Sequence, residues 1–354
     1  MSSLQWDIIM INKMNFFRKI LFPFSILYGI ITSIRNFLYD NEILKSYSFD
    51  VPVIAVGNLS VGGTGKTPQI EYLIRLLSDK YKVATLSRGY KRKSKGFVLA
   101  DKTSNASTLG DEPFQYFQKF KNIQVAVDAD RKNGINQLIS SENKPEIIFL
   151  DDAFQHRKVN AGLYILLTTF TDLYVDDYIL PTGNLRESRS RGKRANIIIV
   201  TKCPKNLSAE AQNQIKSKFK LAHNQQLFFS YIQYDDFVYS ENQKIEAGSF
   251  VKENKLIIAG IAKPELFFEF LKKENDEILQ FPDHHQFSEN DIELIKNKSE
   301  NKHIITTEKD YVRLKDLLDQ EKLFYLPIKC KFIAEQENFD KTILNYVGTS
   351  TGNG

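Results

Sequence analysis

The feature that most constrains this chain is a glycine-rich loop between an apolar strand and a helix. Residues 51–56 form a short apolar, β-branched run, residues 57–67 read GNLSVGGTGKT, and residues 69–77 are amphipathic at helical spacing. Glycines let backbone N–H groups curl around a phosphate, and the start of the next helix adds positive charge. This pattern predicts a phosphate-binding loop formed by Ser60, Val61, Gly62, Gly63, Thr64, Gly65, Lys66 and Thr67.

Within this loop, Lys66 would reach the terminal phosphates and the hydroxyl of Thr67 would bind Mg²⁺. The loop departs from the consensus G-x-x-x-x-G-K-[ST] at Ser60, where a glycine would stand. The alternative is a glycine-rich turn that precedes Lys-Thr by chance. Because the loop lies between a strand and a helix, the context favours a nucleotide site.

A second acidic element supports a nucleotide. The apolar strand 147–150 ends in Asp151 and Asp152, the position at which a phosphate-loop enzyme holds Mg²⁺ directly or through water. Taken alone, the pair would more readily cap a following helix. Together with the loop, it indicates ATP or GTP with Mg²⁺.

The rest of the chain alternates short β-branched runs with amphipathic stretches. This order is typical of an α/β fold with largely parallel sheets covered on both faces. The composition, 42% hydrophobic and 26% charged over 354 residues, excludes a disordered chain and a polytopic membrane protein. An aromatic segment at 225–239 alternates at period two and indicates a β-ribbon. The predicted strands are 51–56, 82–86, 123–127, 147–150, 197–200, 256–259, 303–306 and 323–328.

The N-terminal segment contains a low-charge run from Ile20 to Ile34. It is too short for a spanning helix, which needs about 20 residues. Small and polar residues recur on one side of it at helical spacing, and large apolar residues fall opposite. Such a helix can lie in a bilayer interface or pack on the protein's own core. The polar stripe is Ser25, Gly29, Thr32 and Asn36.

Three further polar clusters carry candidate chemistry. Asp111, in the turn 110–113, could accept the proton of an acceptor hydroxyl, although a helix cap is the alternative. His284 and His285 could orient a carboxylate, but no Cys or third His lies at the spacing of a zinc site. The run 186–194 holds five cations in nine residues, enough to clamp an anion or face lipid headgroups, with a solvated loop as the alternative.

These features occur together, and in the same order, in one family. The chain resembles tetraacyldisaccharide 4′-kinase, the lipid A 4′-kinase family, over most of residues 14–330. Ala153 and Ser188 are small departures from the family pattern. The matching segments are VGNLSVGGTGKTP, LSRGY, GDEP, ADR, LDDAFQHRK, PTGNLRES, VTK, AGIAKPELF, FPDHHQF and TTEKDYVRL.

The resemblance implies an ATP- and Mg²⁺-dependent kinase that phosphorylates the 4′-hydroxyl of a tetraacylated glucosamine disaccharide 1-phosphate. It also implies two α/β/α domains joined by a β-ribbon, with the active site in the cleft between them. By resemblance, the catalytic residues are Asp111 as base, His284 as its orienting partner, and Lys66. The Mg²⁺ ligands would be Thr67, Asp151, Asp152 and Glu187. The substrate-binding residues would be Arg88, Arg131, Gln155 and Arg186.

The same resemblance implies a domain order and a location. The N-terminal helix becomes a membrane anchor, peripheral or monotopic, on the cytoplasmic face of the bacterial inner membrane. The expected partners are the lipid substrate and the bilayer, with no nucleic acid, and the enzyme is expected to be a monomer. A rival is a P-loop ATPase switch acting on a membrane partner, which would hydrolyse ATP without lipid. The expected parts are 14–40 (helix), 41–224 (P-loop kinase core), 225–245 (β-ribbon hinge), 246–346 (C-terminal α/β domain) and 347–354 (disordered tail).

Overall fold

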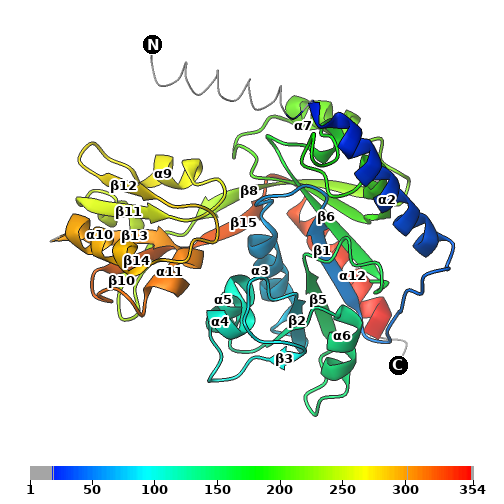
Figure 1. Ribbon diagram of the computed structural model, residues 1–354, viewed down its shortest axis with the longest axis horizontal. Helices are drawn as coiled ribbons and strands as arrows, with labels where there is room; N and C mark the ends of the chain where they lie inside the picture. The colour runs from blue at the N-terminus through cyan, green and yellow to red at the C-terminus, as the bar shows by residue number, and fades with distance from the viewer. Residues whose placement is uncertain (1–17, 19, 301, 352–354) are drawn as a thin grey trace. The chain divides into compact units, whose positions relative to one another are not determined.

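The computed structural model describes residues 18, 20–300 and 302–351. Strands and helices alternate along the chain in a mixed α/β architecture (Figure 1), which confirms the predicted fold class. The chain divides into two compact units. Unit 1 consists of residues 1–66, 146–231 and 332–354, and unit 2 of residues 67–145 and 232–331.

Unit 1 is built on a parallel sheet in the order β8-β7-β6-β1-β5. β1 lies in the interior of this sheet, with Val56 opposite Asp151 on one side and Ile165 on the other. In a parallel sheet the carboxyl ends of neighbouring strands share one edge, so Asp151 lies beside the end of β1. The strands are β1 (Val53–Asn58), β5 (Ile147–Asp151), β6 (Leu163–Thr169), β7 (Ile197–Thr201) and β8 (Gln226–Tyr234).

Alternate residues of β8 face two different layers, as the period of a strand requires. Phe228 packs edge-on against Phe339 of α12 (Gln336–Thr351), with ring centroids 5.3 Å apart. Its neighbour Phe229 instead joins an apolar cluster with Phe219, which follows α7 (Ala209–Ser217). The sheet of unit 1 is therefore covered on both faces. Two short 3₁₀ helices, η1 (Tyr174–Asp176) and η2 (Arg189–Arg194), complete this unit.

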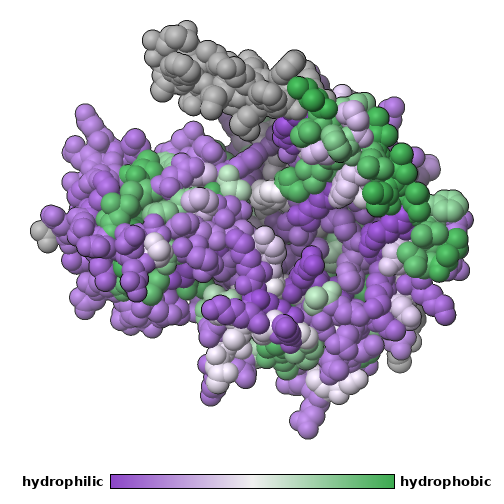
Figure 2. Space-filling view, viewed as in Figure 1, coloured by the Kyte–Doolittle hydropathy of each residue, from purple (hydrophilic) through white to green (hydrophobic). Residues whose placement is uncertain are grey.

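Helix α2 (Phe22–Asp40) packs with its polar side inward. Ser25 and Asn36 are 5% and 1% exposed, and a Cβ added at Gly29 would lie 3.3 Å from Ile179 Cδ1. In Figure 2, hydrophobic side chains run along α2 on the surface. The apolar side does not pack on a core, which removes the core-packing alternative for residues 22–40. The exposed apolar side chains include Phe22, Phe24, Ile26, Leu27, Ile30, Ile31, Ile34 and Phe37.

Residues 14–17 and 19 of the predicted N-terminal helix lie outside the described part of the chain. Within the part that is described, no helix combines the length and the apolar character needed to cross a bilayer.

Unit 2 holds strands of two sheets. In the first, β2 is parallel to β4, which pairs antiparallel with β3. Leu109, Phe114 and Val127 form the core between this sheet and its helices. Its elements are α3 (Lys66–Leu77), β2 (Val83–Ser87), β3 (Val98–Leu99), α4 (Ala106–Leu109), α5 (Asp111–Lys119), β4 (Gln124–Val127) and α6 (Arg131–Ile139).

The second sheet of unit 2 has six strands in the order β10-β9-β14-β13-β11-β12, of which β14, β13, β11 and β12 are parallel. Ile257 packs with the helices α8 and α9, and Ile258 packs with α10 and α11, so helices cover both faces. The elements are β9 (Phe237–Tyr239), β10 (Lys244–Glu246), α8 (Ala247–Phe250), β11 (Lys255–Ala259), α9 (Glu265–Leu271), β12 (Glu277–Gln280), α10 (Glu289–Ser299), β13 (His303–Thr307), α11 (Glu308–Leu314) and β14 (Leu323–Leu326).

The structure corrects two expectations about the end of the chain. The predicted strand 323–328 is two strands, β14 and β15 (Ile328–Phe332), separated at Pro327, whose carbonyl accepts the N–H of Asp235. Residues 347–351 are not part of a disordered tail, because α12 continues to Thr351. Phe339, Ile343 and Val347, one turn apart, are all fully buried and extend the packed face of this helix. Residues 352–354 lie outside the described residues.

Candidate active-site residues in the two units

The phosphate-binding loop begins where β1 approaches another segment too closely for a side chain. A Cβ at Gly57 would lie 2.7 Å from Phe154 Cβ and 2.9 Å from Phe154 N. At the other end of the loop, Gly65 has a φ of +84°, a conformation that other residues rarely adopt. Both glycines are therefore required by the path of the backbone.

The loop is held in place by the segment 181–187, which we call the bridging strip. Val61 N–H donates to the Asn184 carbonyl over 2.8 Å, and Arg186 N–H donates to the Leu59 carbonyl over 2.7 Å. From β7, the hydroxyl of Thr201 donates to the Thr64 carbonyl over 2.8 Å. The backbone of the loop is thus fixed by this unit's own residues.

At the end of the loop, Lys66 faces polar partners of unit 1. Its Nζ lies 3.3 Å from Asn58 Oδ1 and 3.6 Å from Asp152 Oδ1. Arg186 Nη1 lies 3.1 Å from both carboxylate oxygens of Asp152. Two cations therefore share one carboxylate, and a bound phosphate would offer both of them further oxygens.

The acidic pair at the end of β5 does not cap a helix. No helix follows within the described residues 153–162, so the capping alternative does not apply. Asp151 is buried, whereas the Asp152 side chain is 35% exposed and its backbone has a φ of +49°. Gln155, just beyond, donates its amide N–H to the Asn58 carbonyl over 2.9 Å.

Glu187 lies in a buried network with α2. Its carboxylate accepts hydrogen bonds from Asn36 Nδ2 at 3.3 Å and from Arg194 Nη2 at 2.9 Å. Burial lowers the pKa of Arg194 to about 10, and the nearby Glu187 carboxylate opposes this change. Arg191 and Arg157 both pair with Asp40, at the end of α2. Much of the basic run therefore binds carboxylates within unit 1.

In unit 2, Asp111 and His284 are in contact. His284 Nδ1 lies 3.1 Å from Asp111 Oδ2, although 173 residues separate them in sequence. Asp111 is the first residue of α5, whose cap residue is Gly110, so it does not serve as the helix cap. The backbone of His284 has a φ of +57°, and strained residues of this kind cluster at functional sites.

Two cations of α11 complete this cluster. Arg313 donates through Nε to Asp111 Oδ1 at 3.1 Å and through Nη2 to Oδ2. Lys309 Nζ lies 2.9 Å from His284 Nε2. An ammonium group can only donate, so Nε2 accepts, and a neutral His284 then carries its proton on Nδ1 and donates it to Asp111.

The electrostatics of Asp111 follow from these partners. Burial raises its pKa, but the hydrogen bond from His284 and the guanidinium of Arg313 outweigh burial and hold the pKa well below its usual range. The carboxylate is therefore ionised at any physiological pH.

The far ends of α5 and α11 are joined as well. The Nζ atom of Lys119, the last residue of α5, lies 2.6 Å from Glu308 Oε1 at the start of α11. The same Nζ atom lies 2.8 Å from Oε2 of the buried Glu71 of α3. Asp111–Arg313 and Lys119–Glu308 therefore fasten the two helices at both ends.

The remaining predicted residues of unit 2 have other surroundings. His285 pairs with Asp291 at 3.0 Å, so the structure places His284 and not His285 on Asp111. Arg131 is buried and donates to the Asp128 carbonyl at 3.0 Å, while Arg88 is exposed. The sequence analysis assigned no role to Arg313 or Lys309, although both lie in the family-matching segment TTEKDYVRL. Their spacing was a further signal, because positions i and i+4 after a predicted strand share a helix face.

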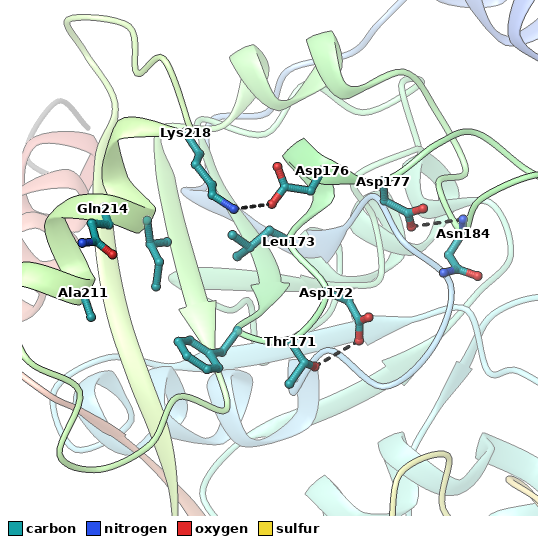
Figure 3. Close-up of a pocket in the computed structure, with 11 residues that line it drawn as sticks. Thr171, Asp172, Leu173, Asp176, Asp177, Asn184, Ala211, Gln214 and Lys218 are labelled. Carbon is teal, nitrogen blue, oxygen red and sulfur yellow. Dashed lines mark hydrogen bonds and ion pairs between the residues drawn. The ribbon is translucent and has the colours of Figure 1, made fainter. Parts of the chain in front are cut away.

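A separate pocket of unit 1 lies between the loop after β6 and helix α7 (Figure 3). Its side chains bond mainly to near neighbours: Lys218 pairs with Asp176 at 2.7 Å, and Asp177 accepts the N–H of Asn184 at 3.1 Å. Lys218, already paired, is the single cation among its lining residues. The pocket therefore lacks the cations that a triphosphate would need.

Comparisons with known proteins agree with these features. The family model for tetraacyldisaccharide-1-P 4′-kinase matches residues 17–348. The tetraacyldisaccharide 4′-kinase of Flavobacterium johnsoniae is 68% identical over 94% of this chain and 98% of its own length. That of Bacteroides thetaiotaomicron is 45% identical over 95% of this chain and 94% of its own length. A crystal structure of LpxK from Aquifex aeolicus in complex with ATP is 31% identical, with a TM-score of 0.75 over 94% of this chain and 99% of that one.

Proposed function

This chain belongs to the tetraacyldisaccharide-1-P 4′-kinase family, and we propose which of its residues carry out the reaction. It is an ATP-dependent kinase that phosphorylates the 4′-hydroxyl of a tetraacylated disaccharide 1-phosphate in lipid A synthesis. The contact between Asp111 and His284 is the observation that carries our assignment. A kinase needs a group to receive the hydroxyl proton, whereas an ATPase switch does not, and family membership does not favour the switch.

We assign the triphosphate of ATP to the loop 60–67, with Lys66 on its terminal phosphates. Asp151, Asp152 and the Thr67 hydroxyl supply oxygen ligands of the kind that Mg²⁺ prefers. Bound Mg²⁺ would offset charge on the phosphate oxygens. Glu187 joins this set by family resemblance alone, because its oxygens already hold Asn36 and Arg194.

In the transfer step, the 4′-oxygen forms a bond to the γ-phosphorus while the bond from phosphorus to the β,γ-bridging oxygen breaks, releasing ADP. The hydroxyl proton passes to Asp111, which His284 orients through Nδ1–H. A carboxylate whose pKa is held low is a weak base. A loose transition state suits such a base, because the attacking oxygen becomes strongly acidic only late in the reaction.

We assign the binding of the lipid substrate to one exposed arginine and three partly or fully buried polar residues. Arg88 is exposed in unit 2, where its guanidinium could face an anion such as the 1-phosphate. Arg186, Arg131 and Gln155 are proposed as further substrate residues on family resemblance. Each of these three already bonds within its own unit, so we expect a supporting role for them.

We further propose that α2 attaches this enzyme to the cytoplasmic face of the bacterial inner membrane, as a peripheral or monotopic monomer. Its outward apolar side supports this, because an amphipathic helix can bury such a side among acyl chains. ATP is supplied on the cytoplasmic side. Replacing Leu27 and Ile31 by Ser should weaken binding to phospholipid vesicles in a flotation assay. Unchanged flotation would contradict the attachment.

The activity itself is tested with protein in detergent, ATP, Mg²⁺ and a tetraacylated disaccharide 1-phosphate. Mass spectrometry should find one added phosphate on the lipid, and Lys66→Ala should abolish it. ATP hydrolysis without a phosphorylated lipid would instead support the ATPase switch.

A further inference from the structure

We propose that helix α2 positions the phosphate-binding loop through the bridging strip (residues 181–187). Ser25 and Tyr28 of α2 are thereby positioning residues for ATP binding, in addition to any role of the helix at a membrane. The proposal rests on the assignment of ATP to the loop 60–67. The residues that carry the coupling all belong to unit 1: Ser25, Tyr28, the strip 181–187 and the loop residues 59–61.

One edge of the bridging strip binds the loop through backbone groups. The hydrogen bonds Val61 N–H to Asn184 O and Arg186 N–H to Leu59 O lie on either side of an antiparallel bridge between Ser60 and Leu185. The loop and the strip therefore form a short two-stranded pairing at the position where phosphates would bind. A shift of the strip would move Leu59, Ser60 and Val61 with it.

The other edge of the strip binds α2 through side chains. The Ser25 hydroxyl donates to Thr182 Oγ1 at 2.7 Å and accepts the N–H of Thr182 at 3.0 Å. The Tyr28 hydroxyl donates to the Arg186 carbonyl at 3.1 Å. Arg18, just before α2, donates to the Pro181 carbonyl and to Asn184 Oδ1.

Arg186 is the residue at which these contacts converge. Its carbonyl accepts from Tyr28, its N–H donates to Leu59, and its guanidinium binds Asp152 beside Lys66. A displacement of α2 at Tyr28 would thus be passed to the loop through Arg186 alone, because this residue contacts both.

The polarity of α2 explains why hydrogen bonds control its position. Its inward side offers Ser25 and Asn36, and most of its large apolar side chains point outward. Because these apolar side chains are exposed, the hydrogen bonds from Ser25 and Tyr28 to the strip help to set the position of the helix. Loss of one such hydrogen bond should therefore change the position of the phosphate-binding loop.

The test compares Ser25→Ala and Tyr28→Phe with Thr32→Val. The Thr32 hydroxyl donates to the Gly29 carbonyl within α2, so this variant loses a hydrogen bond of the same helix without touching the strip. We would measure kcat and the KM for ATP at saturating lipid, the Kd of a fluorescent ATP analogue without lipid, and the melting temperature.

We expect Ser25→Ala and Tyr28→Phe each to raise the KM and the Kd by about three- to tenfold, the range for one lost hydrogen bond. The kcat and the melting temperature should stay close to wild type. Thr32→Val should leave both constants unchanged, and Ser25→Thr, which keeps the hydroxyl, should restore ATP binding.

Two results would overturn the coupling: unchanged ATP binding in both variants, or an equal loss in Thr32→Val. Lys66→Ala separates this failure from failure of the nucleotide assignment. If Lys66→Ala binds the ATP analogue as tightly as wild type, the loop is not the ATP site and the premise itself is wrong. If Lys66→Ala loses binding while Ser25→Ala and Tyr28→Phe keep it, only the coupling is wrong.

Discussion

The two candidate sites are constructed in different ways. In unit 1, the phosphate-binding loop is one continuous stretch whose shape depends on backbone hydrogen bonds and on glycines such as Gly57 and Gly65. In unit 2, the cluster around Asp111 is made of side chains from three distant segments, which supply Asp111, His284 and the pair Lys309 and Arg313. A site of the first kind should fail when the backbone is disturbed, and one of the second kind when a single functional group is removed.

The largest effect is expected from removing the proton acceptor. Asp111→Asn should lower kcat by roughly 10²- to 10⁴-fold, the range for a general base, while the Kd for ATP stays unchanged. The measurement is steady-state transfer to lipid alongside equilibrium binding of ATP. Turnover near the wild-type rate would show that Asp111 is not the base.

A change that acts only through the backbone of unit 1 should instead weaken ATP binding. Gly57→Ala places a Cβ 2.7 Å from Phe154 Cβ, so the loop must shift, at a cost of about 1–3 kcal/mol of stability. We expect the Kd for ATP to rise by about tenfold or more. Gly248→Ala is the matched control, because nothing lies within 4 Å of its added Cβ. Equal ATP binding by the two variants would contradict a site built on backbone shape.

A smaller effect should appear only in the pH dependence. Arg313 helps to hold the pKa of Asp111 below its ordinary value, so Asp111 stays ionised in ordinary assays. In Arg313→Gln, burial would raise this pKa, and the acid limb of kcat/KM should move to higher pH, with activity falling about tenfold per unit below the new pKa. The control is Arg75→Gln, which breaks an ion pair with Glu71 and should leave the acid limb of kcat/KM at the wild-type pH. An unmoved limb in Arg313→Gln would show that Arg313 does not set the proton affinity.

The smallest effect on the reaction is expected at Glu308. Burial and the neighbouring Glu71 raise its pKa from 4.5 to about 7, so the folded state holds the proton more tightly than the unfolded state. The free energy of unfolding should therefore fall as pH rises from about 4.5 to 7. Glu308→Gln should remove this fall in denaturant titrations while leaving kcat near wild type.

The control for Glu308→Gln is Glu277→Gln. Lys298 and Lys302 lower the pKa of Glu277 to about 2, so its removal should leave the fall in stability between pH 4.5 and 7 intact. If wild type shows no such fall, Glu308 is not protonated in this range.

The contrast between the sites also explains what could be predicted. The loop was recognised because its glycines, Lys66 and Thr67 lie within one short motif between a strand and a helix. The contacts of Arg313 and Lys309 depend on the packing of α5 against α11, which no local pattern encodes. Asp111 and His284 were paired by family resemblance, not by spacing.

Similar reasons account for the elements. The strands 51–56, 147–150, 197–200 and 256–259 were found within two residues of β1, β5, β7 and β11, because buried parallel strands are continuous apolar runs. β6 was not predicted although it lies beside β1, since a short apolar run of this kind can equally belong to a helix. For α2, periodicity identified both sides but could not tell which one faces the protein.

The orientation of α2 has a consequence for the handling of this protein in the laboratory. An exposed row of Phe, Leu and Ile side chains along one helix is a ready surface for contact between copies. In detergent-free buffer, we expect reversible clustering that grows with concentration and disperses above the critical micelle concentration of an added detergent. A large apparent mass in gel filtration would then describe solvent conditions and not a defined quaternary structure.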